Sequence, residues 1–201
     1  MRVIVIGGTG TIGSAVVKLL STRHEVVTVG HKRGTYQVDL ASPDSITGLF
    51  KTIGTCDAVV STAGIAKFAS LDDLTYDDYF IGLKNKLMGQ ANLVRIGRPF
   101  VTNHGSFTLT SGVLSQEPMK GSCAISMANA GLEGFVRAAA IDLPRSLRVN
   151  VVSPPWVTET LIARGMDPSI GLPAETVAQC YLASMEGTMT GQVIDPRKPG
   201  A

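Results

Sequence analysis

The first fourteen residues contain a glycine pattern that suits the binding of nucleotide phosphates. Gly7, Gly10 and Gly13 form the spacing G-x-x-G-x-x-G, directly after an apolar run at residues 3–6. Apolar residues then recur at helical spacing, so we expect a buried strand to turn through this loop into a helix. In that geometry, backbone N–H groups and the helix N-terminus bind phosphate, and glycines let a pyrophosphate approach the backbone.

The loop is not a mononucleotide P-loop, because the residue before Ser14 is not a lysine. The alternative to nucleotide binding is a structural turn between a strand and a helix. We predict a dinucleotide site, and the loop residues expected to contact the cofactor are Gly7, Thr9, Gly10, Thr11, Ile12 and Gly13.

A short basic run follows the second expected strand, at residues 25–30. In dinucleotide-binding sheets, an acidic residue at the end of this strand binds the 2′-hydroxyl of NAD, whereas a basic residue accommodates the 2′-phosphate of NADP. Here the strand is followed by His31, Lys32 and Arg33, and Glu25 lies at its opposite end. We therefore predict NADP(H) rather than NAD, with a solvated basic turn as the alternative interpretation.

Length and composition indicate one globular domain over residues 1–201, because a chain of 201 residues with 44% hydrophobic residues can bury one sizeable core. The formal net charge is +2 and the basic residues are scattered, so we expect no nucleic-acid partner. No apolar run resembles a signal peptide or a membrane span, so we expect no membrane partner. The three cysteines lack metal or disulfide spacing, which favours reduced thiols and a cytoplasmic location.

The pattern along the chain alternates short β-branched runs with amphipathic segments, which predicts a doubly wound parallel sheet with helices on both faces. We expect an irregular stretch at residues 156–171 that covers a substrate. The expected strands are residues 3–6, 25–30, 36–40, 57–61, 105–111, 148–153 and 191–195. The expected helices are residues 12–20, 42–53, 76–96, 123–141 and 173–185.

The segment 123–141 has little charge and many small residues, so we expect it to be buried nearly all round. It suits a helix–helix subunit interface, and we expect a homodimer or homotetramer through helices 76–96 and 123–141. Burial by the chain's own sheet and helices is the alternative.

Taken together, several local strings make the chain similar to the short-chain dehydrogenases/reductases over nearly its whole length. They are the N-terminal glycine loop, Val38-Asp39-Leu40, Ser61-Thr62-Ala63-Gly64, Thr110-Ser111-Gly112, Leu132-Glu133-Gly134, the run 148–154 and the terminal Gly191-Gln192-Val193-Ile194-Asp195. The resemblance implies an NAD(P)-dependent oxidoreductase. It also implies that Asp39 lies near the adenine ring, that Ala63 and Gly64 lie against the cofactor ribose, and that Ser111 occupies the place of the catalytic serine.

The resemblance fails at the family's Tyr-x-x-x-Lys motif, in which the tyrosine transfers a proton at the carbonyl oxygen and the lysine lowers its pKa. The tyrosine position falls on Ile125 and the lysine position on Asn129. Isoleucine transfers no proton, and an asparagine hydrogen-bonds a ribose without bringing positive charge. The family's helix asparagine falls on Lys86, and its Pro-Gly after the sixth strand is replaced by Pro154-Pro155.

The residues leave three functions open. The first is an oxidoreductase acting on a carbonyl, an alcohol or a quinone, with Ser111 and Lys86 as candidate catalytic residues and with Asn129 and Pro154 against the cofactor. The second is a sensor or scaffold that holds NADP(H) beside a small effector without turnover, and the third is an oligomeric module without a cofactor. Lys86 lies either in a pocket or on a solvated helix face, and the other proton-transfer candidates are Tyr79, Lys67, Lys120 and His104, of which His104 is expected on the surface.

Overall fold

The computed structural model describes residues 1–198, and within that range a single parallel sheet forms the centre of the molecule. Its seven strands lie in the order β3-β2-β1-β4-β5-β6-β7. All six strand pairs are parallel. The strands are Arg2–Ile6 (β1), Glu25–Gly30 (β2), Tyr36–Gln37 (β3), Cys56–Ser61 (β4), Val101–Thr110 (β5), Arg148–Val152 (β6) and Val193–Ile194 (β7). This confirms the predicted doubly wound fold class.

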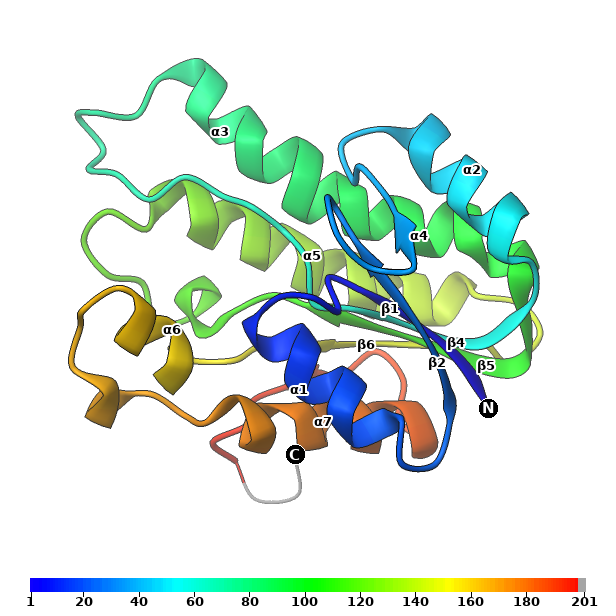
Figure 1. The fold of residues 1–201 in the computed structure, drawn as a ribbon. Coiled ribbons are helices and arrows are strands. Elements are labelled where there is room, and N and C mark those ends of the chain that lie inside the picture. The colour runs from blue at the N-terminus through cyan, green and yellow to red at the C-terminus, as the bar shows by residue number, and fades with distance from the viewer. Residues whose placement is uncertain (199–201) are drawn as a thin grey trace.

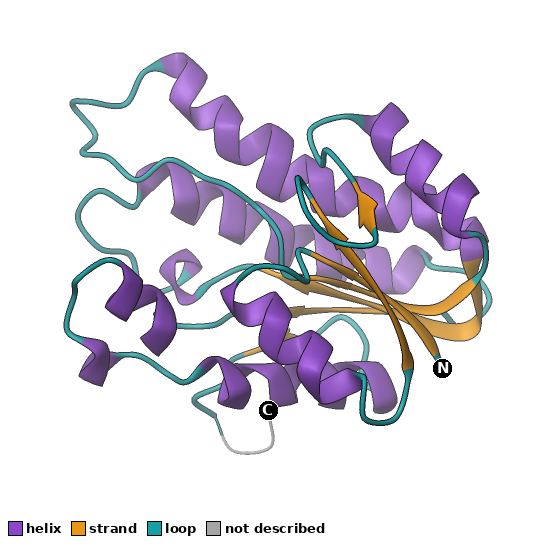
Figure 2. Ribbon diagram, viewed as in Figure 1, coloured by secondary structure: helices purple, strands orange, loops and turns teal. Residues whose placement is uncertain are grey.

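Helices cover both faces of the sheet (Figure 1; Figure 2). One face carries α2, α3, α4 and α5, and the other carries α1, α6 and α7. The helices are Thr11–Leu20 (α1), Pro43–Ile53 (α2), Tyr76–Gly82 (α3), Gly89–Gly97 (α4), Cys123–Asp142 (α5), Thr158–Ala163 (α6) and Ala174–Glu186 (α7). Each layer encloses its own apolar core, because a parallel sheet presents side chains to both faces.

The strand order reverses between β1 and β4, which places a crevice at their carboxyl ends. After β1 the chain continues to β2 on one side of this point, and after β4 it continues to β5 on the other side. Ligands of doubly wound sheets bind in such a crevice, outside the carboxyl ends of the strands. The glycine loop follows β1, and Ser111 and Pro154 follow β5 and β6 closely, so these predicted site residues share one edge of the sheet.

Local signals place several elements where the sequence predicts them. The Ser42 side chain accepts a hydrogen bond from the backbone N–H of Ser45, and Pro43 opens α2. Thr75 and Asp78 form the expected capping box at the start of α3. These caps satisfy N–H groups that the first helical turn leaves without partners.

Several predicted elements differ in the structure. The third strand ends at Gln37 rather than Leu40, because Ser45 Oγ accepts from the Asp39 N–H and Asp39 Oδ1 accepts from the Ala41 N–H at 2.9 Å, which turns the chain away from the sheet. The predicted irregular stretch 156–171 contains α6 and pairs Val157 with Leu172. The fifth strand begins at Val101, before an irregularity in its pairing with β4.

The predicted helix over residues 76–96 is interrupted by a π-helical segment, Leu83–Met88, between α3 and α4. Each π turn contains one residue more than an α turn, so it rotates the following side chains relative to a continuous α-helix. Lys86 lies within this segment and is buried, with 8% of its surface exposed. The interpretation of Lys86 as part of a solvated helix face is therefore wrong.

The alternative that the chain's own sheet and helices bury segment 123–141 nearly all round is wrong. Ala124, Ala128 and Leu132 are fully buried, but Met127 and Ile141 on α5 are 41% and 86% exposed. One face of α5 therefore packs on the chain's own core and the other faces outward. Pairing of subunits through this face stays a prediction. No helix within residues 1–198 combines the length and apolar character needed to cross a membrane.

Candidate active site

A cavity of about 310 Å³ lies at the carboxyl end of the sheet and brings together residues that are far apart in the sequence. Five of the predicted site residues line it: Ile12, Lys86, Ser111, Asn129 and Pro154. They come from the glycine-loop helix, the π-helical segment, the end of β5, α5 and the end of β6. A cavity with apolar walls and a few convergent polar groups is typical of a small-molecule site.

Lys86 supplies a buried cation to this cavity. Its Nζ donates to the backbone carbonyl of Ser111 at 3.0 Å. Burial disfavours the charged form and lowers the pKa of Lys86 from 10.5 to about 8. A lysine with a pKa close to neutral pH can both hold and release a proton under physiological conditions, which suits general acid–base catalysis.

Gln90 fixes the helix that carries Lys86 against the end of β5. Its side-chain amide donates to the carbonyl of Thr110 at 2.9 Å and accepts from the Thr110 N–H at 2.9 Å. The same amide donates to the carbonyl of Lys86 at 3.1 Å. The stem of Lys86 also lies against Gly64, where an added β-carbon would be 2.8 Å from Lys86 Cγ. The Lys86 side chain is therefore held by packing and by backbone contacts.

Asn129 lines the same cavity and contains a buried acceptor atom without a partner. Its Nδ2 donates to the carbonyl of Gly112 at 3.2 Å, and its residue is 1% exposed. Its Oδ1 has no hydrogen-bond partner among residues 1–198. A buried polar atom without a partner costs free energy, so a bound hydroxyl group that reached this atom would be favoured.

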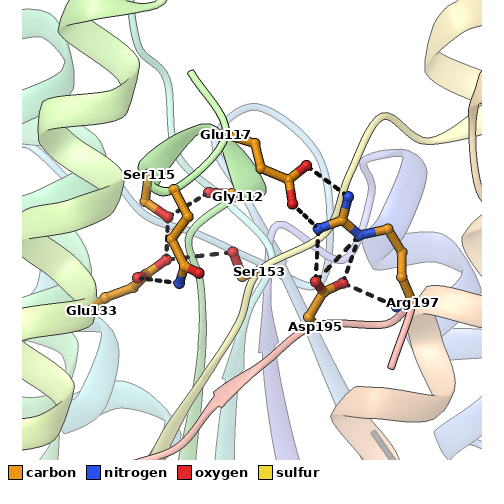
Figure 3. A network of polar contacts seen from close by, with 8 residues as sticks. Gly112, Ser115, Glu117, Glu133, Ser153, Asp195 and Arg197 are labelled. Carbon is orange, nitrogen blue, oxygen red and sulfur yellow. Dashed lines mark hydrogen bonds and ion pairs between the residues drawn. The ribbon is translucent and has the colours of Figure 1, made fainter. Parts of the chain in front are cut away.

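The Ser111 hydroxyl points its proton at a buried carboxylate rather than at the cavity. Ser111 Oγ donates to Glu133 Oε1 at 3.0 Å, and Ser115 Oγ donates to the same oxygen at 2.6 Å. Ser153 and Gln116 also donate to Glu133, and Arg137 Nη2 lies 3.8 Å from Glu133 Oε2. Figure 3 shows part of this network. Ser111 can still accept a hydrogen bond through its oxygen, but its own proton is engaged.

The glycine loop has the geometry needed for phosphate binding. Gly7 has φ 81°, a left-handed conformation that favours glycine. A β-carbon on Gly13 would lie 2.0 Å from the carbonyl oxygen of Gly7, so only glycine lets α1 start this close to the loop. Gly10 precedes α1 and no side chain caps this helix, so the N–H groups of its first turn remain available to an anion. Thr9 and Thr11 flank Gly10 and are exposed.

The residues expected to bind the adenosine half lie along the same edge. His31, Lys32 and Arg33 are exposed directly after β2, and neither Lys32 nor Arg33 forms an ion pair with an acidic residue within residues 1–198. Asp39 is exposed after β3, and Ala63 is half-buried after β4. The residues present therefore fit a dinucleotide that extends from the basic turn across the glycine loop to the cavity.

The other proton-transfer candidates do not line the cavity. Lys67 Nζ lies 3.7 Å from Asp78 Oδ1. His104 is exposed near the start of β5, away from the carboxyl ends of the strands, as its sequence position suggests. The family's tyrosine position, Ile125, does line the cavity and presents only an apolar side chain there.

Sequence reasoning missed several residues of this site. Gln90 and Glu133 are polar residues within helices and became recognisable only when their buried partners were located. Trp156 and Arg164 line the cavity from a stretch in which the sequence has no readable chemical bias. The one sequence feature that points to this stretch is the single tryptophan of the chain, which directly follows Pro154-Pro155.

The strand order and the glycine-rich first crossover define a Rossmann-type nucleotide-binding protein. Residues 10–194 match a family model described as enoyl-(acyl carrier protein) reductase. The chain belongs to the short-chain dehydrogenase/reductase superfamily.

Individual relatives agree with this assignment. The chain is 28% identical to carbonyl reductase family member 4 of Danio rerio, with 95% of this chain and 94% of that protein covered. The solved structure of the protein lin1944 from Listeria innocua has a TM-score of 0.93 and 36% identity, with 97% of this chain and 98% of that chain covered. A small-chain dehydrogenase solved in complex with NADPH has a TM-score of 0.85 and 26% identity, with 97% and 95% covered.

Proposed function

We propose that this chain is an NADP(H)-dependent oxidoreductase that reduces a small carbonyl compound or quinone, with Lys86 as the proton donor. The observation that carries this proposal is the buried Lys86 ammonium in the same cavity as Ser111 and Asn129. The NADPH complex of one relative and the carbonyl reductase name of another support the cofactor and the reaction type.

The site is consistent with an exchange of two residue types between facing helices. In the family, the lysine of the Tyr-x-x-x-Lys motif stands at the position of Asn129. A separate helix asparagine of the family stands at the position of Lys86. Here the cation enters from the segment between α3 and α4, and the amide enters from α5. A positive charge therefore reaches the cavity, although neither the tyrosine nor the lysine of the motif is present.

The roles follow from the groups available. The cofactor, when bound, supplies the hydride for the carbonyl carbon. Lys86, protonated below a pKa of about 8, holds the proton for the carbonyl oxygen. Asn129 Oδ1 accepts from a ribose hydroxyl. Pro154 and Ile12 line the side of the cavity that faces the cofactor. The first turn of α1 binds the pyrophosphate.

Two measurements test this function. NADPH at 100 times its dissociation constant is expected to stabilise the protein by about 2.7 kcal/mol, which a melting shift detects. NADPH oxidation is then followed over a panel of aldehydes, ketones and quinones, and we expect turnover of at least one class. Binding without oxidation of NADPH by any member of the panel would contradict a reductase and indicate a sensor or scaffold.

Cofactor preference gives a separate prediction. The double substitution Lys32→Ala, Arg33→Ala is expected to raise the NADPH dissociation constant roughly tenfold to a hundredfold, because the charge-assisted contacts of this exposed turn with the 2′-phosphate together contribute about 1.5–3 kcal/mol. The NADH constant should change little. Lys51→Ala removes an exposed cation from the last turn of α2 and serves as the control. Equal losses for both cofactors, or tighter NADH binding by the unmodified protein, would rule out 2′-phosphate recognition here.

A further inference from the structure

Arg164 places a guanidinium at the cavity without an acidic partner. It follows the last residue of α6, and its Cζ lies 5.6 Å from the centroid of the Trp156 ring. Both side chains line the cavity that contains Lys86. The stacking contact orients the guanidinium, because arginine packs its planar face on aromatic rings.

The acidic residues near Arg164 in sequence are engaged elsewhere. Both carboxylate oxygens of Glu159 accept from the N–H of Ala174, at 3.1 and 3.0 Å, which fixes α6 against the start of α7. Asp167 Oδ1 accepts from the N–H of Ser169 at 2.9 Å. Within residues 1–198, no carboxylate pairs with Arg164. Its charge therefore remains available to a ligand.

The rest of the cavity limits the shape and charge of that ligand. Lys86 and Arg164 are its charged residues, and no aspartate or glutamate lines it. Phe68, Leu114, Ile125 and Trp156 provide apolar walls. A cavity of about 310 Å³ near the reacting end of a cofactor fits a small molecule with an apolar body and a negatively charged end.

We propose that the substrate is a small, apolar carbonyl compound that carries a carboxylate, and that Arg164 binds this carboxylate. This inference rests on the proposed reductase function. A carboxylate matches the single positive charge and the planar donor fork of one guanidinium. A phosphate dianion would leave one negative charge without a partner at this end of the cavity.

Trp156 allows the proposal to be tested without turnover, because it is the single tryptophan of the chain and lies against Arg164. Its fluorescence is titrated in the presence of NADP⁺ with 4-acetylbenzoate and with the neutral methyl 4-acetylbenzoate. We expect the carboxylate to bind about tenfold more tightly than its ester, because the ester lacks the charge and one of the anionic oxygens that the guanidinium fork binds. Arg164→Gln should abolish this difference and leave the affinity for the ester unchanged.

Matched variants separate a local contact from a general charge effect. Lys51→Gln removes one positive charge from an exposed position on α2 and should leave both affinities unchanged. Arg164→Lys keeps the charge but loses the planar fork, so it should give an intermediate preference. An unchanged preference in Arg164→Gln would overturn the role of Arg164.

Other outcomes overturn the inference in distinct ways. Equal affinity of the unmodified protein for acid and ester would exclude a carboxylate substrate, while reduction of the ester by NADPH would leave the proposed function intact. Tighter binding of 4-acetylphenyl phosphate than of 4-acetylbenzoate would show that the site prefers a phosphate to a carboxylate.

Two further outcomes concern the role of Arg164. A rise in the NADP⁺ dissociation constant of Arg164→Gln, with the carboxylate preference kept, would assign Arg164 to the cofactor. Arg164-dependent binding of 4-acetylbenzoate without NADPH oxidation would support the anion site and contradict the reductase.

Discussion

Replacement of Lys86 by methionine is expected to lower kcat for carbonyl reduction by about 10²–10⁴-fold, the usual cost of removing one general acid. Lys86 is the buried cation of the cavity, and its Nζ is held by the carbonyl of Ser111. The Ser111 hydroxyl cannot replace it as a donor, because its proton is directed at Glu133. Methionine keeps the unbranched stem that packs on Gly64 and removes only the ionisable end.

The pH dependence distinguishes proton transfer from simple electrostatic binding. Reduction requires protonated Lys86, so the reduction rate of the unmodified protein should fall as pH rises through about 8, the pKa set by burial of this lysine. Oxidation of an alcohol requires the neutral amine and should rise over the same range. The methionine variant should lack both inflections in steady-state rates measured from pH 6 to 10.

The pH dependence of the free energy of unfolding should reveal that the charge of Lys86 is buried. Burial lowers its pKa in the folded state to about 8 from 10.5, so the unfolded chain binds more protons between these values. The free energy of unfolding should therefore rise with pH in this window. Lys86→Met removes the buried charge, so urea unfolding at pH 7 should show no loss of stability. An unfolded variant would contradict this account of Lys86.

A rescue experiment separates the loss of a proton donor from damage to the cavity. In Lys86→Met, the further substitutions Ile125→Tyr and Asn129→Lys restore the family motif on α5. Ile125 lines the cavity, so a phenol at this position would reach the same space. Recovery of carbonyl reduction is expected. A wild-type rate in Lys86→Met alone would exclude Lys86 as the acid.

Much of the fold was predictable because the signals that determine it are local. The buried β-branched runs gave β1, β2 and β4 nearly to the residue, and Ser42-Pro43 marked the start of α2. Alternation of strands and helices restricts the chain to a parallel sheet whose loops meet at one edge. The position of the site at this edge follows from topology alone.

The inner geometry of the site was not predictable, because it depends on contacts between distant residues. A π-helical segment shifts the phase of a helix without a distinctive composition, so the sequence left Lys86 on either face. Gln90 and Glu133 are buried only because β5 ends beside them. Arg164 becomes informative once Glu159 and Asp167 are found to bind other groups.

The second large effect is expected at the glycine loop. Gly13→Ala should lower NADPH affinity by about 100-fold or more and destabilise the protein by roughly 1–3 kcal/mol, as in other overpacked sites. The added methyl would lie 2.0 Å from the carbonyl oxygen of Gly7 and 2.7 Å from Thr62 Oγ1. Either α1 or the loop must move, and the N–H groups of the first turn move with it. Urea unfolding and NADPH titration measure the two effects.

A second glycine separates nucleotide binding from folding. At Gly10 the added methyl would meet only the Gly7 carbonyl oxygen, at 3.3 Å, and the backbone there has φ −87°, which alanine adopts readily. Gly10→Ala should therefore fold normally but bind NADPH about tenfold or more weakly, because its methyl lies where a phosphate approaches the helix N-terminus. Gly48→Ala is the control, since its β-carbon meets no atom within 4 Å and α2 should gain about 0.5–1 kcal/mol. Unchanged NADPH binding by Gly10→Ala would show that the pyrophosphate does not use this loop.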